Sequence, residues 1–218
     1  MLNPVENDFF LASYKNVTDV KYSRVITRFK RKLTHPGRYM ETELGDLFCD
    51  ILAESLALDV MLLASGAIRN DSLGPVVQVS DLAECFPYDG DVRLLHISGK
   101  QLKAMFTYVF RDEVFKGAAS GFFQISKRLR VKYDVKQRKI SDFTFDGEPI
   151  EDDRLYKVGM QQFHYRSFQK YFNFPLSEIE ENHPTRVVAT SARVVIEERL
   201  SECQNIDKEI DGRIIIKE

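Results

Sequence analysis

The sequence has no excess of charge of either sign and no long apolar run. Its 218 residues include 31 Lys and Arg and 33 Asp and Glu, which gives a formal net charge of -2. A surface that follows the phosphates of a nucleic acid normally needs a large basic excess, and a membrane-spanning helix needs roughly 20 consecutive apolar residues. Neither a nucleic-acid polymer nor a membrane is therefore expected as a partner.

Export signals and paired cysteines are also missing. The N-terminus has neither the basic start nor the apolar stretch of a signal peptide, and Cys49, Cys85 and Cys203 are odd in number and without Cys-x-x-Cys spacing. The cysteines are therefore expected to be small hydrophobes in a reducing compartment. As given, the chain is expected to be cytoplasmic, or periplasmic or extracellular if it is a piece of an exported precursor.

The sequence contains no motif that supports catalysis. A dinuclear phosphatase holds its metals with clustered Asp, His and Asn side chains, whereas no histidine of this chain stands in an Asp-x-His or Gly-His-x-His setting. The four histidines are His35, His96, His164 and His183. P-loop, dinucleotide and Gly-x-Ser-x-Gly patterns are missing as well. We therefore predict neither catalytic nor metal-binding residues.

What the sequence does contain is a helix-rich first part followed by a run of strands. Thr42 is a plausible N-cap, and apolar residues then recur at helical spacing up to about residue 58. Residues 22–33 predict an amphipathic helix or a helix-strand junction, and 98–100 a turn. Further helices are expected over 80–84, 101–110 and 191–200. Strands are expected over 60–63, 76–79, 92–97, 122–125, 129–135, 140–145, 156–160 and 212–216, and a strand or loop over 184–190.

This order of elements predicts an α+β fold, a single domain with a mixed β-sheet flanked by helices. Hydrophobic residues at 44% and charged residues at 29% are ordinary for a soluble globular protein of this size. We expect residues 1–32 to form a lead-in segment with a helix, and residues 33–218 to form the main domain.

The stretch from Leu62 to Asn70 is the best candidate for a binding loop. An apolar run ends in Ala-Ser-Gly-Ala and is followed by Arg69. Because these small residues leave the backbone N–H groups open to close approach, and arginine adds a planar fork of donors, the loop suits a phosphate, a carboxylate or a sugar. An ordinary tight turn with a surface arginine is the alternative.

Four motifs in a fixed order resemble one known family. They are Arg-x-x-Glu-x-x-Leu-Gly-Asp-Leu-x-x-Asp at 38–50, Ser-Gly-Ala-Ile-Arg at 65–69, Phe-Pro-Tyr at 86–88, and Phe-Asp-Gly-Glu-Pro-Ile at 145–150 leading to Tyr-Lys-Val at 156–158 and Phe163. Together they make the chain, from about residue 33 to its end, similar to the C-terminal domain of 5'-nucleotidases and UDP-sugar hydrolases.

The resemblance implies a substrate-binding role. In that family this domain holds the nucleoside part of the substrate, and a separate N-terminal metallophosphatase domain with two divalent metal ions performs the hydrolysis. The partners implied are therefore a nucleotide or nucleoside and a metallophosphatase domain absent from this chain. The substrate-binding residues carried over are Arg38, Ser65, Gly66, Arg69, Tyr88 and Phe163, with the two aromatic rings enclosing the base.

Two positions depart from the family pattern. Ala64 stands where the family has Asn, and the segment after Phe163 reads His-Tyr-Arg-Ser-Phe, without the family's Gly-Gly-Asp-Gly loop and its ribose-binding aspartate. The resemblance as a whole implies that the parent protein is a hydrolase that dephosphorylates nucleoside 5'-monophosphates or cleaves UDP-sugars, with this chain as its binding domain. A non-catalytic interaction module with the same fold and a degenerate site is the alternative.

Overall fold

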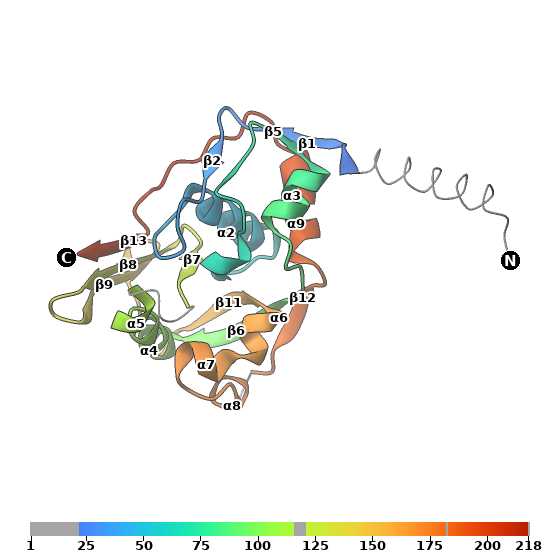
Figure 1. Ribbon diagram of the computed structural model, residues 1–218. Helices are drawn as coiled ribbons and strands as arrows, with labels where there is room; N and C mark the ends of the chain where they lie inside the picture. The colour runs from blue at the N-terminus through green and yellow to red at the C-terminus, as the bar shows by residue number, and fades with distance from the viewer. Residues whose placement is uncertain (1–21, 116–120, 182, 218) are drawn as a thin grey trace, which may run out of the picture.

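A five-stranded mixed sheet forms the centre of the computed structural model, which describes residues 22–115, 121–181 and 183–217 (Figure 1). Its strand order is β12-β6-β11-β3-β7. β3 and β11 are parallel, whereas the other neighbours are antiparallel. The strands are Arg186–Ala189 (β12), Val92–Ser98 (β6), Leu155–Gln161 (β11), Val60–Ala64 (β3) and Phe123–Ile125 (β7).

A second sheet of four strands packs beside the first, in the order β10-β9-β8-β13. Its strands are Glu148–Pro149 (β10), Lys139–Phe145 (β9), Leu129–Asp134 (β8) and Ile214–Lys217 (β13). Two small antiparallel pairs complete the described strands: β1 with β5, and β2 with β4. They are Val25–Arg28 (β1), Val76–Gln78 (β5), Leu33–Thr34 (β2) and Ser72–Leu73 (β4).

Helices cover both faces of the central sheet. In Figure 1, α2, α3 and α9 lie on one side of β6 and β11, and α4, α7 and α8 lie on the other. The helices are Glu43–Ser55 (α2), Val79–Cys85 (α3), Gly99–Val109 (α4), Asp112–Phe115 (α5), Gln162–Arg166 (α6), Phe168–Phe172 (α7), Ser177–Glu180 (α8) and Ala192–Ser201 (α9). The predicted fold, α+β with a mixed sheet flanked by helices, is confirmed.

Strand β3 separates two hydrophobic cores. Val60 and Leu62 point into the core that contains α4, α7 and the second sheet, while Met61 and Leu63 point into the core beneath α2, α3 and α9. All five residues of β3 are buried. A strand that is covered on both faces reads as a continuous apolar run, which is why the pattern at 60–63 predicted this strand correctly.

The structure corrects two local predictions. A helix was one interpretation of residues 22–33, and it is wrong for Val25–Arg28, which form strand β1. Pairing with β5 overrides the helical spacing of the apolar residues in this segment. Residues 98–100, predicted as a turn, are instead the end of β6 and the start of α4, with Ser98 as the N-cap and Gly99 as the first helical residue. The Ser98 hydroxyl accepts from the Gln101 N–H and the Gln101 side chain accepts from the Ser98 N–H, so that the two form a capping box.

The remaining local predictions include one that is confirmed, some helices that were missed and one division that is not tested. The N-cap at Thr42 is confirmed, since its hydroxyl accepts from the Gly45 N–H at 3.1 Å. Helices α6, α7 and α8 were not predicted. Most of the lead-in segment, residues 1–21, lies outside the described residues, and the division into 1–32 and 33–218 stays a prediction.

A buried arginine joins α2 to the end of the chain. Arg213 is fully buried just before β13, and its two Nη atoms donate to the Asp50 carboxylate on α2 at 2.8 and 2.6 Å. Nη1 also donates to the Ile125 carbonyl at 2.8 Å. On either side of Arg213, the carboxylate of Glu41 accepts from the Gly212 and Ile214 N–H groups, each at 3.0 Å. The 38–50 motif therefore provides Asp50, which pairs with this arginine, and Glu41, which binds the backbone on either side of it.

The side chain of Asp46 faces the same arginine, but its two carboxyl oxygens have no hydrogen-bond partner among the described residues. One carboxylate oxygen lies 3.5 Å from Arg213 Nε, and the side chain is fully buried. Burial raises the pKa of Asp46 to about 8, against the opposing attraction of Arg213 and with a further contribution from the neighbouring Glu41. The Asp46 carboxyl is therefore largely protonated in the folded protein at neutral pH.

This protonation predicts a pH dependence of stability. The pKa of Asp46 is raised from 3.8 to about 8 on folding, so the folded state holds a proton that the unfolded state has lost, and stability falls as pH rises between these values. Asp46→Asn should remove that slope. We expect the stability of Asp46→Asn relative to the parent to increase steadily from pH 5 to pH 8 in denaturant unfolding.

Asp142→Asn is the matched control, because Asp142 is a half-buried β9 residue that pairs with Lys132 at the surface. It should leave the slope in place. Equal pH slopes for the parent and Asp46→Asn would contradict the assignment of a protonated carboxyl at Asp46.

Gln124 ties two loops at the edge of the central sheet to each other. It is fully buried; its amide nitrogen donates to the Met40 carbonyl at 2.8 Å and to the Ser65 hydroxyl at 3.0 Å, and its oxygen accepts from the Thr42 N–H at 3.1 Å. Its side chain lies directly over Gly45, where a Cβ would come within 2.3 Å of Oε1. Gly45 therefore provides the space in which Gln124 makes these bonds.

Gly45→Ala should consequently destabilise the fold. Because the added methyl displaces a buried, fully bonded amide, we expect a loss of about 1–3 kcal/mol of unfolding free energy, measured by urea denaturation. Gly66→Ala is the control, since a Cβ at Gly66 meets no atom within 4 Å. Equal stability of the two variants would disprove this role of Gly45.

Candidate functional site

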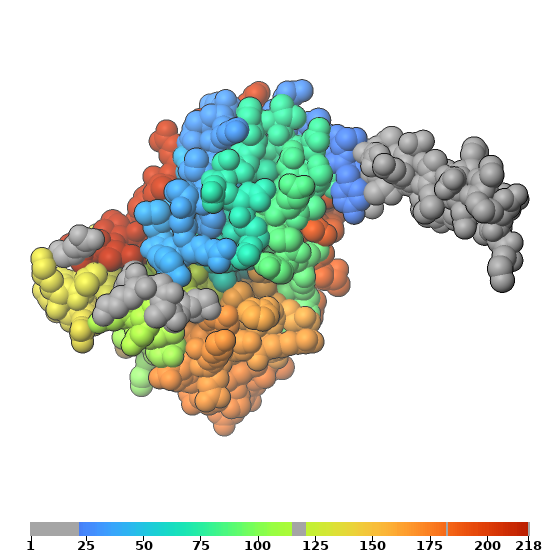
Figure 2. Space-filling model, in the orientation of Figure 1, coloured from blue at the N-terminus to red at the C-terminus, as the bar shows by residue number. Residues whose placement is uncertain are grey.

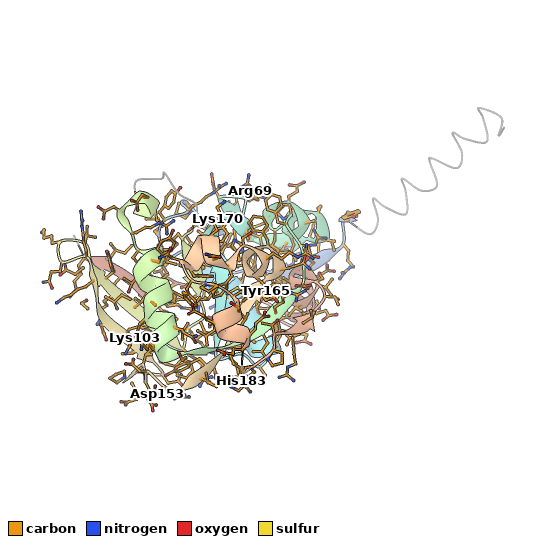
Figure 3. The ribbon with its side chains drawn as sticks, turned by 90° about the horizontal axis from the view of Figure 1, so that it is seen from below. Arg69, Lys103, Asp153, Tyr165, Lys170 and His183 are labelled. Atoms are coloured by element: carbon orange, nitrogen blue, oxygen red, sulfur yellow. The ribbon has the colours of Figure 1, made fainter. Side chains whose placement is uncertain are left out.

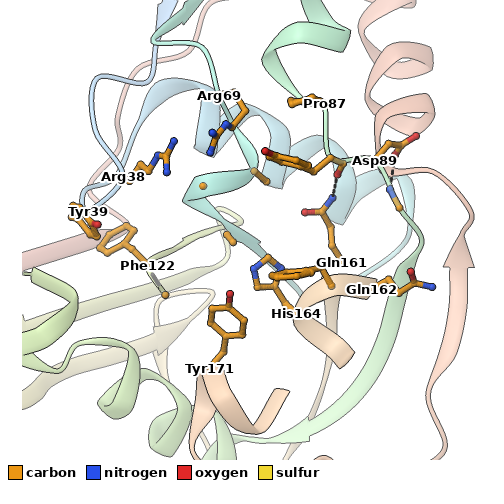
Figure 4. Close-up of a pocket in the computed structure, with 17 residues that line it drawn as sticks. Arg38, Tyr39, Arg69, Pro87, Asp89, Phe122, Gln161, Gln162, His164 and Tyr171 are labelled. Carbon is orange, nitrogen blue, oxygen red and sulfur yellow. Dashed lines mark hydrogen bonds between the residues drawn. The ribbon is translucent and has the colours of Figure 1, made fainter. Parts of the chain in front are cut away.

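A pocket of about 650 Å³ opens at one edge of the central sheet (Figure 4). The parallel strands β3 and β11 both end there, and ligand sites in sheets of this kind commonly form at the carboxyl ends of parallel strands. β3 leads into a short 3-10 turn, Ser65–Ala67, and β11 leads into α6. The pocket is lined by Arg38, Tyr39, Ala64, Gly66, Ala67, Arg69, Pro87, Tyr88, Asp89, Gly90, Gly121, Phe122, Gln161, Gln162, Phe163, His164 and Tyr171.

The surrounding surface is built from segments that are distant in sequence. In the space-filling view, residues of the first third of the chain form the upper part of the molecule and residues of about 155–180 form the lower part (Figure 2). Figure 3 places Arg69 at one edge, whereas His183 and Asp153 lie at the opposite one. The pocket edge is thus the one at which β11 ends, and Asp153 lies near the end at which it begins.

The structure brings together all but one of the residues predicted to bind substrate. Arg38, Gly66, Arg69, Tyr88 and Phe163 line the pocket. The remaining one, Ser65, does not: its side chain is buried and its hydroxyl accepts the hydrogen bond from Gln124. The side chain of Ser65 therefore helps to position the loop after β3.

Two guanidinium groups lie on the same side of the pocket. Figure 4 shows Arg38 and Arg69 facing His164 and Tyr171 across the opening. Both arginines are exposed, and neither has an ion-pair partner within 4 Å among the described residues. The Arg69 N–H donates to the Cys85 carbonyl at 2.8 Å, which fixes its loop. These side chains give this side of the pocket two positive charges with which no described carboxylate forms an ion pair within 4 Å.

Two aromatic side chains at the pocket are unusually exposed. Tyr88 is 60% exposed and Phe163 is 63% exposed, although large apolar rings tend to be buried. The Gln161 amide donates to the Tyr88 carbonyl at 3.1 Å and so holds the loop, while Phe163 packs edge-on against His164 with ring centroids 5.1 Å apart. The rings are thus next to groups that restrain them and remain largely exposed.

His164 forms part of the pocket wall beneath Phe163. It is buried among rings, with centroids 4.8 Å from Tyr171 and 5.3 Å from Phe123. Burial lowers the pKa of His164 to about 4, because no nearby anion compensates for the lost hydration of the imidazolium. The ring is therefore neutral at physiological pH, and its Nδ1 has no hydrogen-bond partner in the described part of the chain.

The carboxylate of Asp89 forms hydrogen bonds within the protein. It accepts from the Ser191 hydroxyl at 2.5 Å, from the Arg193 N–H at 3.1 Å and from the Gly90 N–H at 2.9 Å. Ser191 is also the N-cap of α9. Asp89 therefore anchors the loop that carries Tyr88 to the start of α9.

Several lining residues were missed by sequence reasoning, among them Tyr39, Asp89, Gln161 and Tyr171. Tyr39 stands at an unspecified position of the 38–50 motif, and the other three belong to no motif that signals binding. Gln161 carries one weak signal, since it follows a predicted strand at its end, where ligand-binding side chains are common.

Among the described residues, one group of three carboxylates is close enough to share a cation, and it lies outside the pocket. It consists of Glu41, Asp46 and Asp211. The guanidinium of Arg213 already contacts Asp211 at 3.1 Å, and both oxygens of Glu41 accept from backbone N–H groups. Asp211 is therefore occupied by the arginine, which also faces Asp46 at 3.5 Å, and Glu41 is occupied by the backbone.

The chain is similar to known proteins both in sequence and in fold. The family model of the 5'-nucleotidase C-terminal domain matches residues 20–173, and no curated protein gives a significant match. A 5'-nucleotidase precursor from Thermus thermophilus superposes with a TM-score of 0.79 and 20% identity, covering 96% of this chain and 43% of that one. NAD nucleotidase from Haemophilus influenzae superposes with a TM-score of 0.69 and 14% identity, covering 99% and 42%.

A third solved structure belongs to an enzyme of a different name. Sulfate thiohydrolase from Thermus thermophilus, in complex with glycerol, superposes with a TM-score of 0.66 and 14% identity, covering 99% of this chain and 39% of that one. At these identities the three structures show the fold alone, and this chain spans less than half of each. No helix among the described residues is long and apolar enough to cross a bilayer. Because the family model covers well over half of the sequence, the chain belongs to the family of 5'-nucleotidase C-terminal domains.

Proposed function

We propose that the pocket binds a nucleotide, with the base between Tyr88 and Phe163 and the phosphate at Arg38 and Arg69. The observation that carries this proposal is the convergence of two exposed rings and two unpaired guanidinium groups on one pocket. Its volume, about 650 Å³, is in the usual range for small-molecule sites.

The rings supply the affinity for a base. Each base that stacks on an aromatic side chain gains about 1–3 kcal/mol, whatever its hydrogen-bonding edge, because every base has a π-face. The Arg69 guanidinium carbon additionally lies over the Tyr88 ring, 5.4 Å from its centroid, so that a stacking group and a charged group are neighbours. A ligand with a planar aromatic part and an anion fits this arrangement.

The arginines supply the affinity for phosphate. A guanidinium donates two parallel hydrogen bonds to phosphate oxygens and keeps its charge at all physiological pH values. Since neither Arg38 nor Arg69 is engaged in an ion pair within the described residues, an anion would not have to displace a protein carboxylate from them. Binding should therefore weaken as salt concentration rises.

In this proposal, a separate domain catalyses the hydrolysis. The 5'-nucleotidase precursor and the NAD nucleotidase are more than twice as long as the segment matched here. We infer that this chain is the binding part of a phosphoric ester hydrolase and acts with a metallophosphatase domain that contributes two divalent metal ions. The substrates would be nucleoside 5'-monophosphates or UDP-sugars.

Titration calorimetry of the whole chain with AMP, UMP and UDP-glucose tests the binding. Arg69→Ala should weaken binding of the tightest ligand by about 10- to 100-fold, because it removes charge-assisted hydrogen bonds of about 1.5–3 kcal/mol. Arg199→Ala is the matched control: Arg199 is an exposed α9 residue that pairs with Glu202 and does not line the pocket.

Two results would contradict the proposal. One is the absence of heat with all three ligands at millimolar concentration. The other is binding that Arg69→Ala and Arg199→Ala affect equally, since this would locate the ligand elsewhere.

Gly66→Ala tests whether the ligand approaches the turn after β3. A Cβ at Gly66 meets no protein atom within 4 Å and would project into open space at the pocket wall, so the variant should fold like the parent. The methyl group should nevertheless weaken AMP binding roughly tenfold by steric overlap. Unchanged affinity in calorimetry would show that the ligand does not contact this turn.

A further inference from the structure

Some polar groups of the pocket are free to bond a ligand, whereas others are already hydrogen-bonded within the protein. Donors are available at Arg38 and Arg69, which have no ion-pair partner within the described ranges. The carboxylate among the described lining residues is that of Asp89, and it already accepts hydrogen bonds from Gly90, Ser191 and Arg193. The charged groups that remain free are therefore donors.

The side-chain amides of the pocket are partly engaged as well. Gln161 donates to the Tyr88 carbonyl at 3.1 Å, and Gln162 donates to the Asp91 carboxylate at 2.8 Å. Their oxygens remain as neutral acceptors. His164 is neutral, because burial lowers its pKa to about 4, and its Nδ1 is enclosed in the protein wall.

A phosphate is bound by hydrogen-bond donors, whereas the ribose hydroxyls are recognised best by a hydrogen-bond acceptor. A phosphate accepts hydrogen bonds and carries charge, so guanidinium groups recognise it strongly. The vicinal hydroxyls of ribose are read best by a charged acceptor, and a site built to bond a hydroxyl rejects the analogue without it by roughly 10⁴-fold or more. In this pocket the only described carboxylate already accepts three hydrogen bonds from the protein, and the other free acceptors are neutral amides, so the means of making that distinction are weak.

We propose that the pocket selects nucleotides by base and phosphate and does not read the ribose hydroxyls, so that ribo- and 2'-deoxyribonucleoside monophosphates bind alike. The inference rests on the proposed function and defines its substrate class. Asp89 is central to it, because its carboxylate already accepts three hydrogen bonds in the anchor to α9.

The test is a calorimetric titration of the whole chain with AMP, dAMP and adenosine under the same salt conditions. We expect the AMP and dAMP dissociation constants to agree within about fivefold, and adenosine to bind at least tenfold more weakly than AMP, because it lacks the group that the arginines contact. An AMP preference over dAMP of more than about fivefold would overturn the inference while leaving nucleotide binding intact. Adenosine binding as tightly as AMP would also overturn it.

Failure of the proposed function gives a different result, namely no binding of AMP or dAMP at millimolar concentration. A variant separates the role of Asp89 from its effect on folding. Asp89→Asn should lower stability, since it weakens the anchor to α9, and leave the ratio of AMP to dAMP affinity unchanged. Ser191→Ala weakens the same anchor and keeps the carboxylate, so it serves as the stability control. A selective loss of AMP affinity in Asp89→Asn would show that the carboxylate reads the ribose.

Discussion

The buried guanidinium of Arg213 is the interaction on which the rest of the structure depends. It binds Asp50 on α2, Asp211 in its own loop and the carbonyl of Ile125 at the end of β7, and Glu41 binds the backbone on both sides of it. A buried arginine is tolerated only when its charge is matched and its donors are satisfied. Satisfying them forces the main helix, the central sheet and the last strand into one arrangement.

The pocket is a consequence of that arrangement. Gln124, on β7, bonds both the backbone that leads into α2 and the hydroxyl of Ser65 in the turn after β3. The loop carrying Arg38 and the turn leading to Arg69 are thereby held at the same sheet edge. Because β3 and β11 run parallel, α6 and its Phe163 arrive at this edge too. Rigid elements thus position side chains that come from loops.

Local pattern was sufficient for the elements that are buried on both faces or capped by their own residues. β3 is a short apolar run, and α2 follows an N-cap threonine, so both were predictable from neighbouring residues alone. The strand at Val25–Arg28 was not, because its partner, β5 at Val76–Gln78, is distant in sequence. Helices α6 to α8 are four or five residues long, too short for a helical period to be recognised.

The sequence by itself determined the fold class and the family, and it selected Arg38, Gly66, Arg69, Tyr88 and Phe163 as candidate binding residues, since each lies in a motif readable within a few positions. Only the tertiary structure decided that these residues share a pocket, that the side chain of Ser65 faces the protein, and that Asp89 is consumed as an anchor. The physical reason is that hydrogen-bond partners such as Gln124 and Ser191 are far away in sequence. Which polar groups remain free for a ligand is known only when every internal bond has been assigned.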